Sequence, residues 1–252
     1  MIYHLDITAS TNDDARDEKY REGDVVWADF QTAGRGQRGH VWHSCKGENL
    51  TFSVVLEPTF MPIAEQFSVS EVVALSLVDM LSEYGIEARV KWTNDIYVGD
   101  KKLVGILIEH SLAPTTLRRT IVGVGINVNQ REFDPSIPNP VSMAQLLGRE
   151  LDAEEVLQCF LKHLQQNYEF LRRIKNSQLS TLNSQLNSDD ALHSRYNSLL
   201  YRRDEFHTYA LPSGERFRAK ILSTAPNGAL CLENEKGKTK EYLFKEVEFV
   251  IF

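Results

Sequence analysis

Cysteine is scarce in this chain of 252 residues, and its pattern excludes a disulfide-stabilised secreted fold. Cys45, Cys159 and Cys231 are odd in number, far apart and in no CxxC pair. Disulfide-rich domains depend on an even set of closely spaced cysteines. The sequence therefore argues against a disulfide framework.

Long apolar runs are missing as well. No stretch approaches the roughly 20 apolar residues that a transmembrane helix needs. The first residues, Met1 to Asp14, turn acidic quickly and lack the apolar core of a signal peptide. We therefore expect a cytoplasmic protein with no membrane partner.

A basic excess is also absent, because 28 Lys and Arg stand against 35 Asp and Glu, which gives a net charge of −7. A protein that binds nucleic acid needs a basic face for the phosphates, so we expect no DNA partner. The 42% of hydrophobic residues is typical of a globular chain, and the length suits either one large domain or a large domain with a small second one.

Runs rich in β-branched residues predict strands. Leu103–Glu109 is apolar at nearly every position, as in a strand buried on both faces. The other predicted strands are Asp24–Phe30, Leu50–Glu57, Ile86–Trp92 and Thr120–Asn129.

Apolar residues at helical spacing predict a helix over Ala64–Tyr84, which Gly85 ends. Ser10 is the predicted N-cap of a first helix that runs to about Tyr20.

Two further helix starts are predicted from capping-box spacing, at Ser142 with Gln145 and at Asp152 with Glu155. Gly148 is expected to end the first of these helices. The second presents an apolar stripe of Leu157, Phe160, Leu161, Leu164, Tyr168 and Leu171.

The composition changes at Asn176. Residues 176–190 are mostly Ser, Asn, Gln and Asp with leucines at helical spacing, which predicts a polar connecting helix. After about Arg195, short apolar runs separated by PSG, PNG and EKG turns indicate a small all-β module. We expect an α+β protein with domains at residues 1–190 and 191–252.

The first candidate site is the glycine-rich segment 31–39, which follows a predicted strand. Its glycines let backbone N–H groups approach an anion closely, and Arg35 and Arg38 add charge suited to a carboxylate or phosphate. A flexible basic surface loop is the alternative. The GxGxxG spacing is not followed by a helical pattern, so a dinucleotide-binding fold is only weakly indicated.

The second candidate site is a predicted β-hairpin over residues 91–109. Asp95 lies where one strand breaks, and Lys102 starts the apolar strand. A carboxylate near a lysine could hold Mg²⁺ and neutralise phosphate charge. Solvated turn lysines and an Asx turn are the alternative.

Other chemistry-bearing residues carry less weight. His40, His43 and Cys45 lack the further ligands that a tetrahedral zinc site needs, so no resident metal is expected. Gly123 and Gly125 interrupt a strand, as where another group approaches closely. No GxSxG, HExxH or P-loop motif occurs.

Taken in order, these segments resemble the biotin protein ligase family, also called biotin–[acetyl-CoA-carboxylase] ligases. The family's motifs are Ser-Thr-Asn, GRGxxGxxW, KWPND, KxxGIL and GxGIN. Here they stand at residues 10–12, 34–42, 91–95, 102–107 and 123–127. The resemblance implies a mixed-sheet catalytic domain of the biotin/lipoate ligase type, followed by a small SH3-like β-barrel.

The resemblance also implies a two-step reaction that uses ATP, biotin and Mg²⁺. Biotin is activated to biotinyl-5′-AMP and then transferred to a lysine of a biotin carboxyl carrier protein. Two anions must meet in the first step, so positive charge has to offset their repulsion. Lys102, Arg35 and Arg38 match the family's cationic residues, and Asp95 would orient the acceptor lysine or the metal.

The same matching divides the remaining residues between two ligands. The biotin site would comprise Ser10, Thr11, Asn12, Gln31, Gly34, Arg35, Gly36, Gln37, Lys102 and Gly105. The nucleotide site would comprise Arg38, Trp42, Asn94 and Asn127, with Trp42 stacking on adenine.

Two positions depart from the family's motifs. Gln37 replaces an arginine in the loop, which implies altered retention of the adenylate rather than lost activity. Thr93 replaces the proline of KWPND, which makes the turn less rigid but removes no functional group. Only nine residues precede Ser10, so we expect a monofunctional ligase without the DNA-binding domain that some members carry.

Two other functions stay open. A lipoate or octanoate ligase or transferase shares the catalytic fold, whereas a pure binding protein would need no lysine for transition-state charge. The oligomeric state is open too, because an exposed sheet edge near Thr120–Asn129 could pair two protomers in a homodimer or dock the carrier domain.

Overall fold

The computed structural model describes residues 1–39, 41–178 and 189–251, and its main unit is a seven-stranded mixed sheet. The strand order is β1-β2-β3-β7-β6-β5-β4. The strands are β1 (Ile2–Thr8), β2 (Val25–Gln31), β3 (Leu50–Leu56), β4 (Arg89–Lys91), β5 (Asp95–Val98), β6 (Lys101–Leu112) and β7 (Leu117–Ile126). β1 and β2 run parallel and the other neighbours are antiparallel, which confirms the expected α+β fold.

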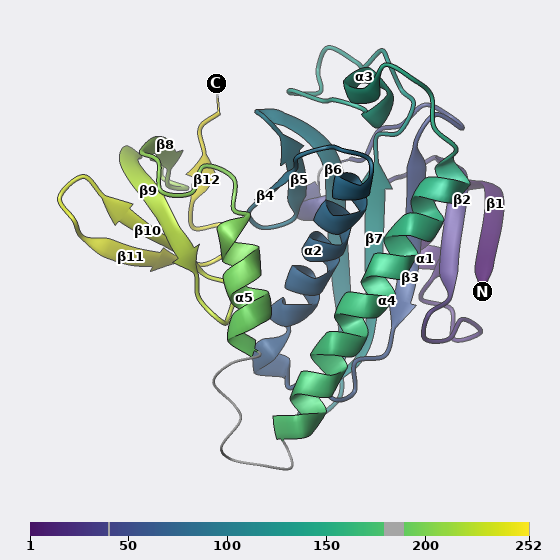
Figure 1. The fold of residues 1–252 in the computed structure, drawn as a ribbon, viewed down its shortest axis with the longest axis horizontal. Helices are drawn as coiled ribbons and strands as arrows, with labels where there is room; N and C mark the ends of the chain where they lie inside the picture. Colours follow the sequence, from purple (N-terminus) through teal and green to yellow (C-terminus); the bar gives the residue numbers. More distant parts are fainter. Residues whose placement is uncertain (40, 179–188, 252) are drawn as a thin grey trace.

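Helices α2 (Phe67–Glu83) and α4 (Ala153–Gln178) cover one face of this sheet (Figure 1). The predicted apolar stripe of α4 is confirmed, since Phe160 is fully buried and lies 5.3 Å from the Phe52 ring of β3. The short helix α3 (Met143–Leu147) begins at the predicted capping box. Hydrogen bonds between neighbouring residues fix the start of α3, which is why the sequence predicts it.

The first helix is shorter than expected. α1 spans Thr11–Asp14, and the Ser10 side chain makes no capping hydrogen bond. Beyond α1 the chain turns so that Tyr20 is buried and packs edge-on against Tyr3 of β1, at 4.9 Å between ring centroids. This tertiary packing outweighs the local helical pattern.

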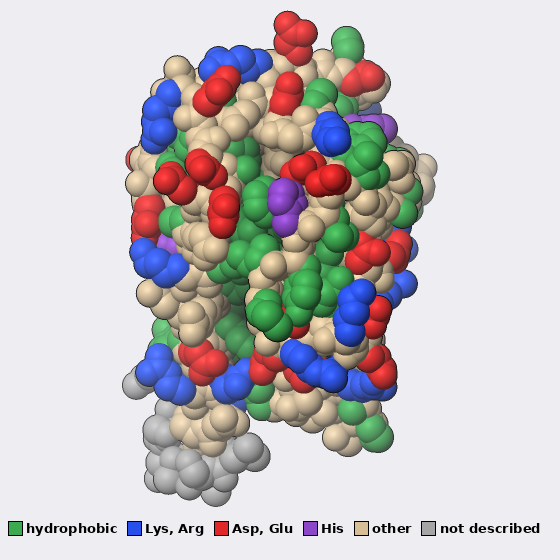
Figure 2. Space-filling model, turned by 90° about the vertical axis from the view of Figure 1, so that its right-hand side faces the viewer, with side chains coloured by type: hydrophobic (Ala, Val, Ile, Leu, Met, Phe, Trp, Pro, Cys, Tyr) green, Lys and Arg blue, Asp and Glu red, His purple; other side chains and the backbone are tan. Residues whose placement is uncertain are grey.

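The predicted sheet edge near Thr120–Asn129 was wrong, because β7 is hydrogen-bonded to β3 on one side and β6 on the other. One open edge belongs instead to β1, a strand that was not predicted although apolar and polar residues alternate along most of it. Figure 2 looks onto this side of the molecule, where hydrophobic side chains are exposed between acidic and basic ones. The predicted strand Ile86–Trp92 is also shorter, since only Arg89–Lys91 pairs as β4.

A second, antiparallel sheet follows α5 (Asp189–Ser198), at the left of Figure 1. Its order is β11-β10-β9-β8-β12, with β8 (His207–Ala210), β9 (Arg216–Thr224), β10 (Leu230–Asn234), β11 (Thr239–Tyr242) and β12 (Glu248–Phe249). The three predicted turns join consecutive strands, and Gly214, Gly228 and Gly237 have φ angles of 85°, 85° and 74°. We call residues 199–251 the C-terminal module.

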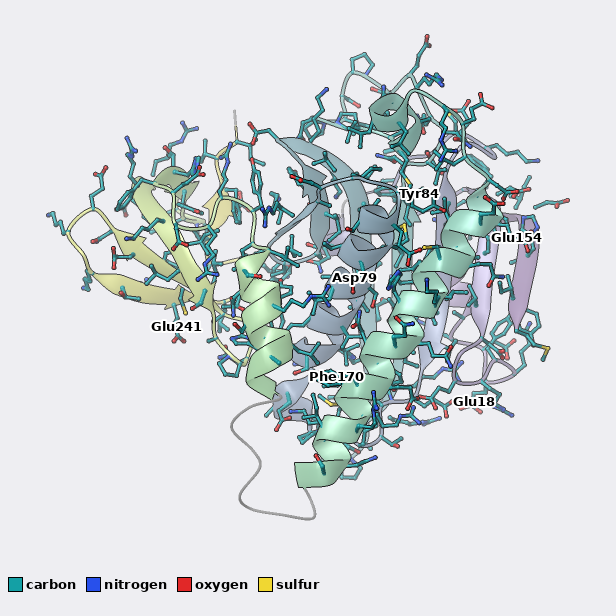
Figure 3. The ribbon with its side chains drawn as sticks, viewed as in Figure 1. Glu18, Asp79, Tyr84, Glu154, Phe170 and Glu241 are labelled. Carbon is teal, nitrogen blue, oxygen red and sulfur yellow. The ribbon has the colours of Figure 1, made fainter. Side chains whose placement is uncertain are left out.

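Polar contacts of α5 hold the C-terminal module against the main unit. Asp79 of α2, labelled in Figure 3, accepts a hydrogen bond from Asn167 of α4 at 3.1 Å and pairs with Arg195 of α5. Asn197 of α5 accepts a 2.6 Å hydrogen bond from the backbone N–H of Thr224 at the end of β9.

The predicted polar connecting helix falls mostly on residues 179–188, which lie outside the described residues. The predicted domain boundary at residue 190 falls at the start of α5 and stays a prediction. None of the described helices combines the length and the apolar character required to cross a bilayer.

Candidate active site

A cavity of about 350 Å³ lies between the main sheet, the glycine-rich loop (residues 34–42) and the C-terminal module. Most of the residues expected to bind biotin or nucleotide line it. They are Ser10, Thr11, Asn12, Gln31, Arg35, Gly36, Gln37, Trp42, Asn94, Asp95, Lys102 and Gly105. The exceptions are Gly34, Asn127 and Arg38, and the side chain of Arg38 lies outside the described part of the structure.

The start of α1 and the end of β2 build a polar wall of the cavity. Because β1 and β2 run parallel, the chain leaves both at the same edge, which places Thr11 beside Gln31. Gln31 Oε1 accepts hydrogen bonds from the Thr11 backbone N at 2.8 Å and from Thr11 Oγ1 at 3.1 Å. Ser53 Oγ lies 2.8 Å from Thr11 Oγ1 and 2.6 Å from Asn12 Oδ1. Thr11, Asn12 and Ser53 are buried, and together with Gln31 they form a set of neutral donors and acceptors.

Glycines on two neighbouring strands make room for other side chains. Gly105 of β6 is the cross-strand partner of Gly125 of β7, and the Trp42 ring lies on both. A Cβ on Gly105 would lie 3.0 Å from Trp42 Cζ3, and one on Gly125 would overlap the ring. A Cβ on Gly123 would overlap the Asn12 amide. The expectation of close approach is confirmed for β7, and at Gly105 the approaching group is Trp42.

Lys102 and Asp95 form an ion pair at the cavity, with Lys102 Nζ 2.7 Å from Asp95 Oδ1. Side chains alternate along a strand, so Lys102 points inward while Lys101 is exposed. Lys91 Nζ lies 3.5 Å from Asp95 Oδ2. One carboxylate therefore faces two ammonium groups at the cavity.

Arg35 contacts two carboxylates in this structure. Its guanidinium nitrogens lie 3.1 and 3.2 Å from the oxygens of Glu109 and 2.7 Å from Asp13 Oδ1. Glu109 also accepts a 2.9 Å hydrogen bond from Asn12 Nδ2 and pairs with Arg16 at 2.7 Å. Burial acts to raise the pKa of Glu109, but the hydrogen bonds from Asn12 and Arg35 and the charges of Arg35 and Arg16 outweigh it and lower that pKa. Neither Glu109 nor Asp13 was predicted from the sequence as a site residue.

The glycine-rich loop is closed at its base by a hydrogen bond from the Trp42 backbone N to Gly34 O, at 2.9 Å. Gly34 therefore contributes its backbone to loop closure. Gln37 lies at the cavity, with its Oε1 3.5 Å from Thr93 Oγ1.

The two asparagines expected at the nucleotide make backbone contacts. Asn94 Nδ2 donates to the carbonyl of Ile106 at 2.8 Å, so Asn94 ties the hairpin to β6 beside the cavity. Asn127 is buried outside the cavity lining, and its Nδ2 donates to Val141 O at 3.0 Å. A contact of Asn127 with nucleotide stays a prediction.

Four residues of the C-terminal module complete the cavity, namely Phe244, Val247, Glu248 and Phe249. The Phe249 ring centroid lies 5.3 Å from Lys91 Nζ. Sequence reasoning missed all four, because only the docking of the module brings them to the site.

Among the described residues, Glu83, Cys159 and His163 bring possible metal-ligand atoms within 4.8 Å of one another. Hydrogen bonds from Lys162, Cys159 and His163 lower the pKa of Glu83 to about 2. Because Lys162 Nζ already lies 2.7 Å from this carboxylate, its charge opposes a cation there. His40, one of the three possible ligands in the sequence, lies outside the described residues.

The chain also matches known proteins. Residues 2–127 match the biotin/lipoate A/B protein ligase family. The bifunctional ligase/repressor BirA of Bacillus subtilis is 35% identical over 174 residues, which are 67% of this chain and 53% of that protein. The biotin–[acetyl-CoA-carboxylase] ligase of Paracoccus denitrificans is 35% identical over 139 residues, 52% of this chain and 57% of that protein. The chain thus spans about half the length of these curated relatives.

A solved structure agrees over nearly the whole chain. The biotin protein ligase from Aquifex aeolicus, in complex with biotin and ATP, has a TM-score of 0.79 at 27% identity and covers 99% of both chains. The family match covers half of this chain, and its motifs line the cavity. The chain therefore belongs to the biotin/lipoate A/B protein ligase family.

Proposed function

We propose that the chain is a biotin protein ligase, which forms biotinyl-5′-AMP from biotin and ATP and then transfers biotin to a lysine of a biotin carboxyl carrier protein. The observation that carries the proposal is the Lys102–Asp95 ion pair, 2.7 Å long, in a cavity that also holds the neutral polar groups of Thr11 and Gln31. The Aquifex aeolicus protein, which binds biotin and ATP, supports the choice of substrates.

In the first step the cavity brings two anions together. The groups of Thr11, Asn12 and Gln31 are suited to hydrogen-bond the ureido head of biotin, and the Trp42 ring supplies an apolar wall. A carboxylate oxygen of biotin forms a bond to the α-phosphorus while the bond to pyrophosphate breaks. Lys102 stabilises the negative charge that develops between the two reactants.

In the second step the acceptor amine attacks the carbonyl carbon, the bond to AMP breaks, and the amine loses a proton. Asp95 accepts a hydrogen bond from this amine in the proposed step, a role supported by its carboxylate lying at the cavity beside Lys102. The same carboxylate is an oxygen ligand of the kind that Mg²⁺ prefers, with substrate phosphates supplying others. Bound Mg²⁺ would neutralise charge on the leaving pyrophosphate.

Mass spectrometry tests the proposal. The purified chain is mixed with biotin, ATP, Mg²⁺ and a biotin carrier domain, and in parallel with lipoate and a lipoyl carrier domain. We expect the biotin carrier to gain the mass of biotin less one water, only when ATP is present. Modification of the lipoyl carrier alone would assign the chain to the lipoate branch of the family instead.

A further inference from the structure

We propose that Glu109 is a positioning residue of this site, whose carboxylate joins Asn12 in the cavity to Arg35 at the base of the glycine-rich loop. The kinetic part of the proposal rests on the proposed ligase function. The structural part does not, because it concerns the loop without any ligand.

The contacts of Glu109 use both of its oxygens. Oε2 accepts hydrogen bonds from Asn12 Nδ2 at 2.9 Å and from Arg35 at 3.1 Å, and Oε1 accepts from Arg35 at 3.2 Å. The two nitrogens of one guanidinium therefore meet the two oxygens of one carboxylate, which is the bidentate geometry that fixes direction as well as distance. The Glu109 side chain is 26% exposed and that of Arg35 is 38% exposed, so solvent screens the pair in part and the proposal rests on the two-point geometry.

The position of Glu109 follows from strand alternation. Gly105, Leu107 and Glu109 share one face of β6, and Asn12 bonds to the carbonyl of Leu107 at 3.3 Å as well as to Glu109. The Asn12 amide also fills the space above Gly123. Glu109 thus orients a buried cavity side chain and, through Arg35, holds the base of the loop, where the Trp42 backbone N bonds to Gly34 O.

Arg16 provides a matched control. Arg16 Nη2 lies 2.7 Å from Glu109 Oε1, one of the two oxygens that Arg35 contacts. The Arg16 side chain is 54% exposed and does not line the cavity. Removing Arg16 takes one charge partner from Glu109 and leaves Asn12 and Arg35 bound to it. An Arg16 variant therefore reports the effect of losing one charge near Glu109, whereas a Glu109 variant also loses the contacts that position Asn12 and Arg35.

The experiment compares Glu109→Gln, Glu109→Asp, Arg16→Gln, Arg35→Gln and the double variant Glu109→Gln/Arg35→Gln, each checked for folding by circular dichroism. Pyrophosphate release gives kcat and the KM for biotin. We expect Glu109→Gln to raise the KM for biotin about tenfold, as the loss of a charged hydrogen bond does, with a smaller change in kcat. Glu109→Asp should recover part of the loss, and Arg16→Gln should stay within about twofold of wild type.

The double variant isolates the path through Arg35. If Glu109 acts through Arg35, the double variant falls well short of the product of the two single effects. Single effects that multiply, or equal effects of Glu109→Gln and Arg16→Gln, overturn the proposal.

The rate at which trypsin cleaves the ligand-free protein within residues 35–39 is an independent measure of how firmly the loop is held. Glu109→Gln should be cleaved faster than Arg16→Gln, and equal rates count against the proposal. If the wild-type chain forms no biotinyl-5′-AMP, the ligase proposal fails, and this cleavage comparison alone decides the role of Glu109.

Discussion

Lys101 and Lys102 are neighbours in the sequence that point in opposite directions from β6. Lys102 pairs with Asp95 at the cavity, whereas Lys101 is exposed. We expect Lys102→Ala to slow biotinyl-5′-AMP formation by about 100-fold or more, which is the usual cost of losing one preorganised charge-stabilising group. Lys101→Ala should stay within about twofold of wild type. Single-turnover pyrophosphate release measures both, and similar rates for the two variants would remove Lys102 from the chemistry.

Glu109 gives a pH dependence with a defined sign. Its pKa is lowered in the folded protein, since the contacts of Asn12, Arg35 and Arg16 outweigh the effect of burial. The unfolded chain therefore binds the proton first on acidification, and the stabilisation is lost as the pH falls below the ordinary glutamate pKa of about 4.3. We expect urea unfolding of wild type and Glu109→Gln to differ by a constant amount near neutral pH and by less below about pH 4. Stability curves that stay parallel below about pH 4 would contradict the prediction.

Single residues differed in how far the sequence revealed them. Lys102 and Asp95 were predicted from their places at the ends of predicted strands and Gln31 from the family resemblance, and all three line the cavity. Glu109 also ends an apolar run, but its contacts with Asn12 and Arg35 join segments that only the folded sheet brings together.

At the scale of elements, helix ends that depend on hydrogen bonds between neighbouring residues were predicted correctly. Ends that depend on tertiary packing were not. The capping box before α3 and the glycine after α2 follow from neighbouring residues, and Gly85 has a φ of 74°. The first helix ended early because Tyr20 is drawn into a small core beside β1. The strand order was not predicted either, because the neighbours of β7 depend on pairing across the whole sheet.

The paired glycines of β6 and β7 allow a graded test of the space above these strands. A Cβ at position 125 overlaps the Trp42 ring, whereas one at position 105 lies 3.0 Å from it. We expect Gly125→Ala to lower the free energy of unfolding by about 1–3 kcal/mol, as overpacking does, and Gly105→Ala to cost less. Urea unfolding gives the two costs. Tryptophan emission should shift further to the red in Gly125→Ala, because the Trp42 ring is displaced. A larger cost at Gly105 than at Gly125 would mean that Trp42 does not rest where the structure places it.

At the scale of the whole molecule, the C-terminal module was recognisable but its docking was not. Its turns were visible as glycine-containing triplets, and each joins two strands. The change to short strands predicted after about Arg195 gave no sign that α5 packs on α2. In the structure Tyr196 of α5 is fully buried, and its ring lies 5.5 Å from the Phe67 ring. A deletion from residue 196 would therefore damage the main unit, and point variants at the junction are the better probe.

Trp92 is the residue that joins the two units beside the cavity. Its indole Nε1 donates a 2.9 Å buried hydrogen bond to the carbonyl of Gly228, and its ring lies 6.4 Å from Phe244 of the module. Trp92→Phe keeps an aromatic ring but leaves the Gly228 carbonyl without this donor, so we expect it to lower the free energy of unfolding by about 1–3 kcal/mol.

Trp27→Phe is the matched control for Trp92→Phe. Trp27 Nε1 is buried and donates to no acceptor among the described residues, so the control loses similar ring volume but no hydrogen bond. The difference between the two variants in urea unfolding therefore isolates the contact between the units. Because the module supplies Phe244, Glu248 and Phe249 to the cavity, Trp92→Phe should also raise the KM for ATP, while Trp27→Phe should leave it unchanged. Equal stability losses with an unchanged KM for ATP would show that the module closes the cavity without help from this hydrogen bond.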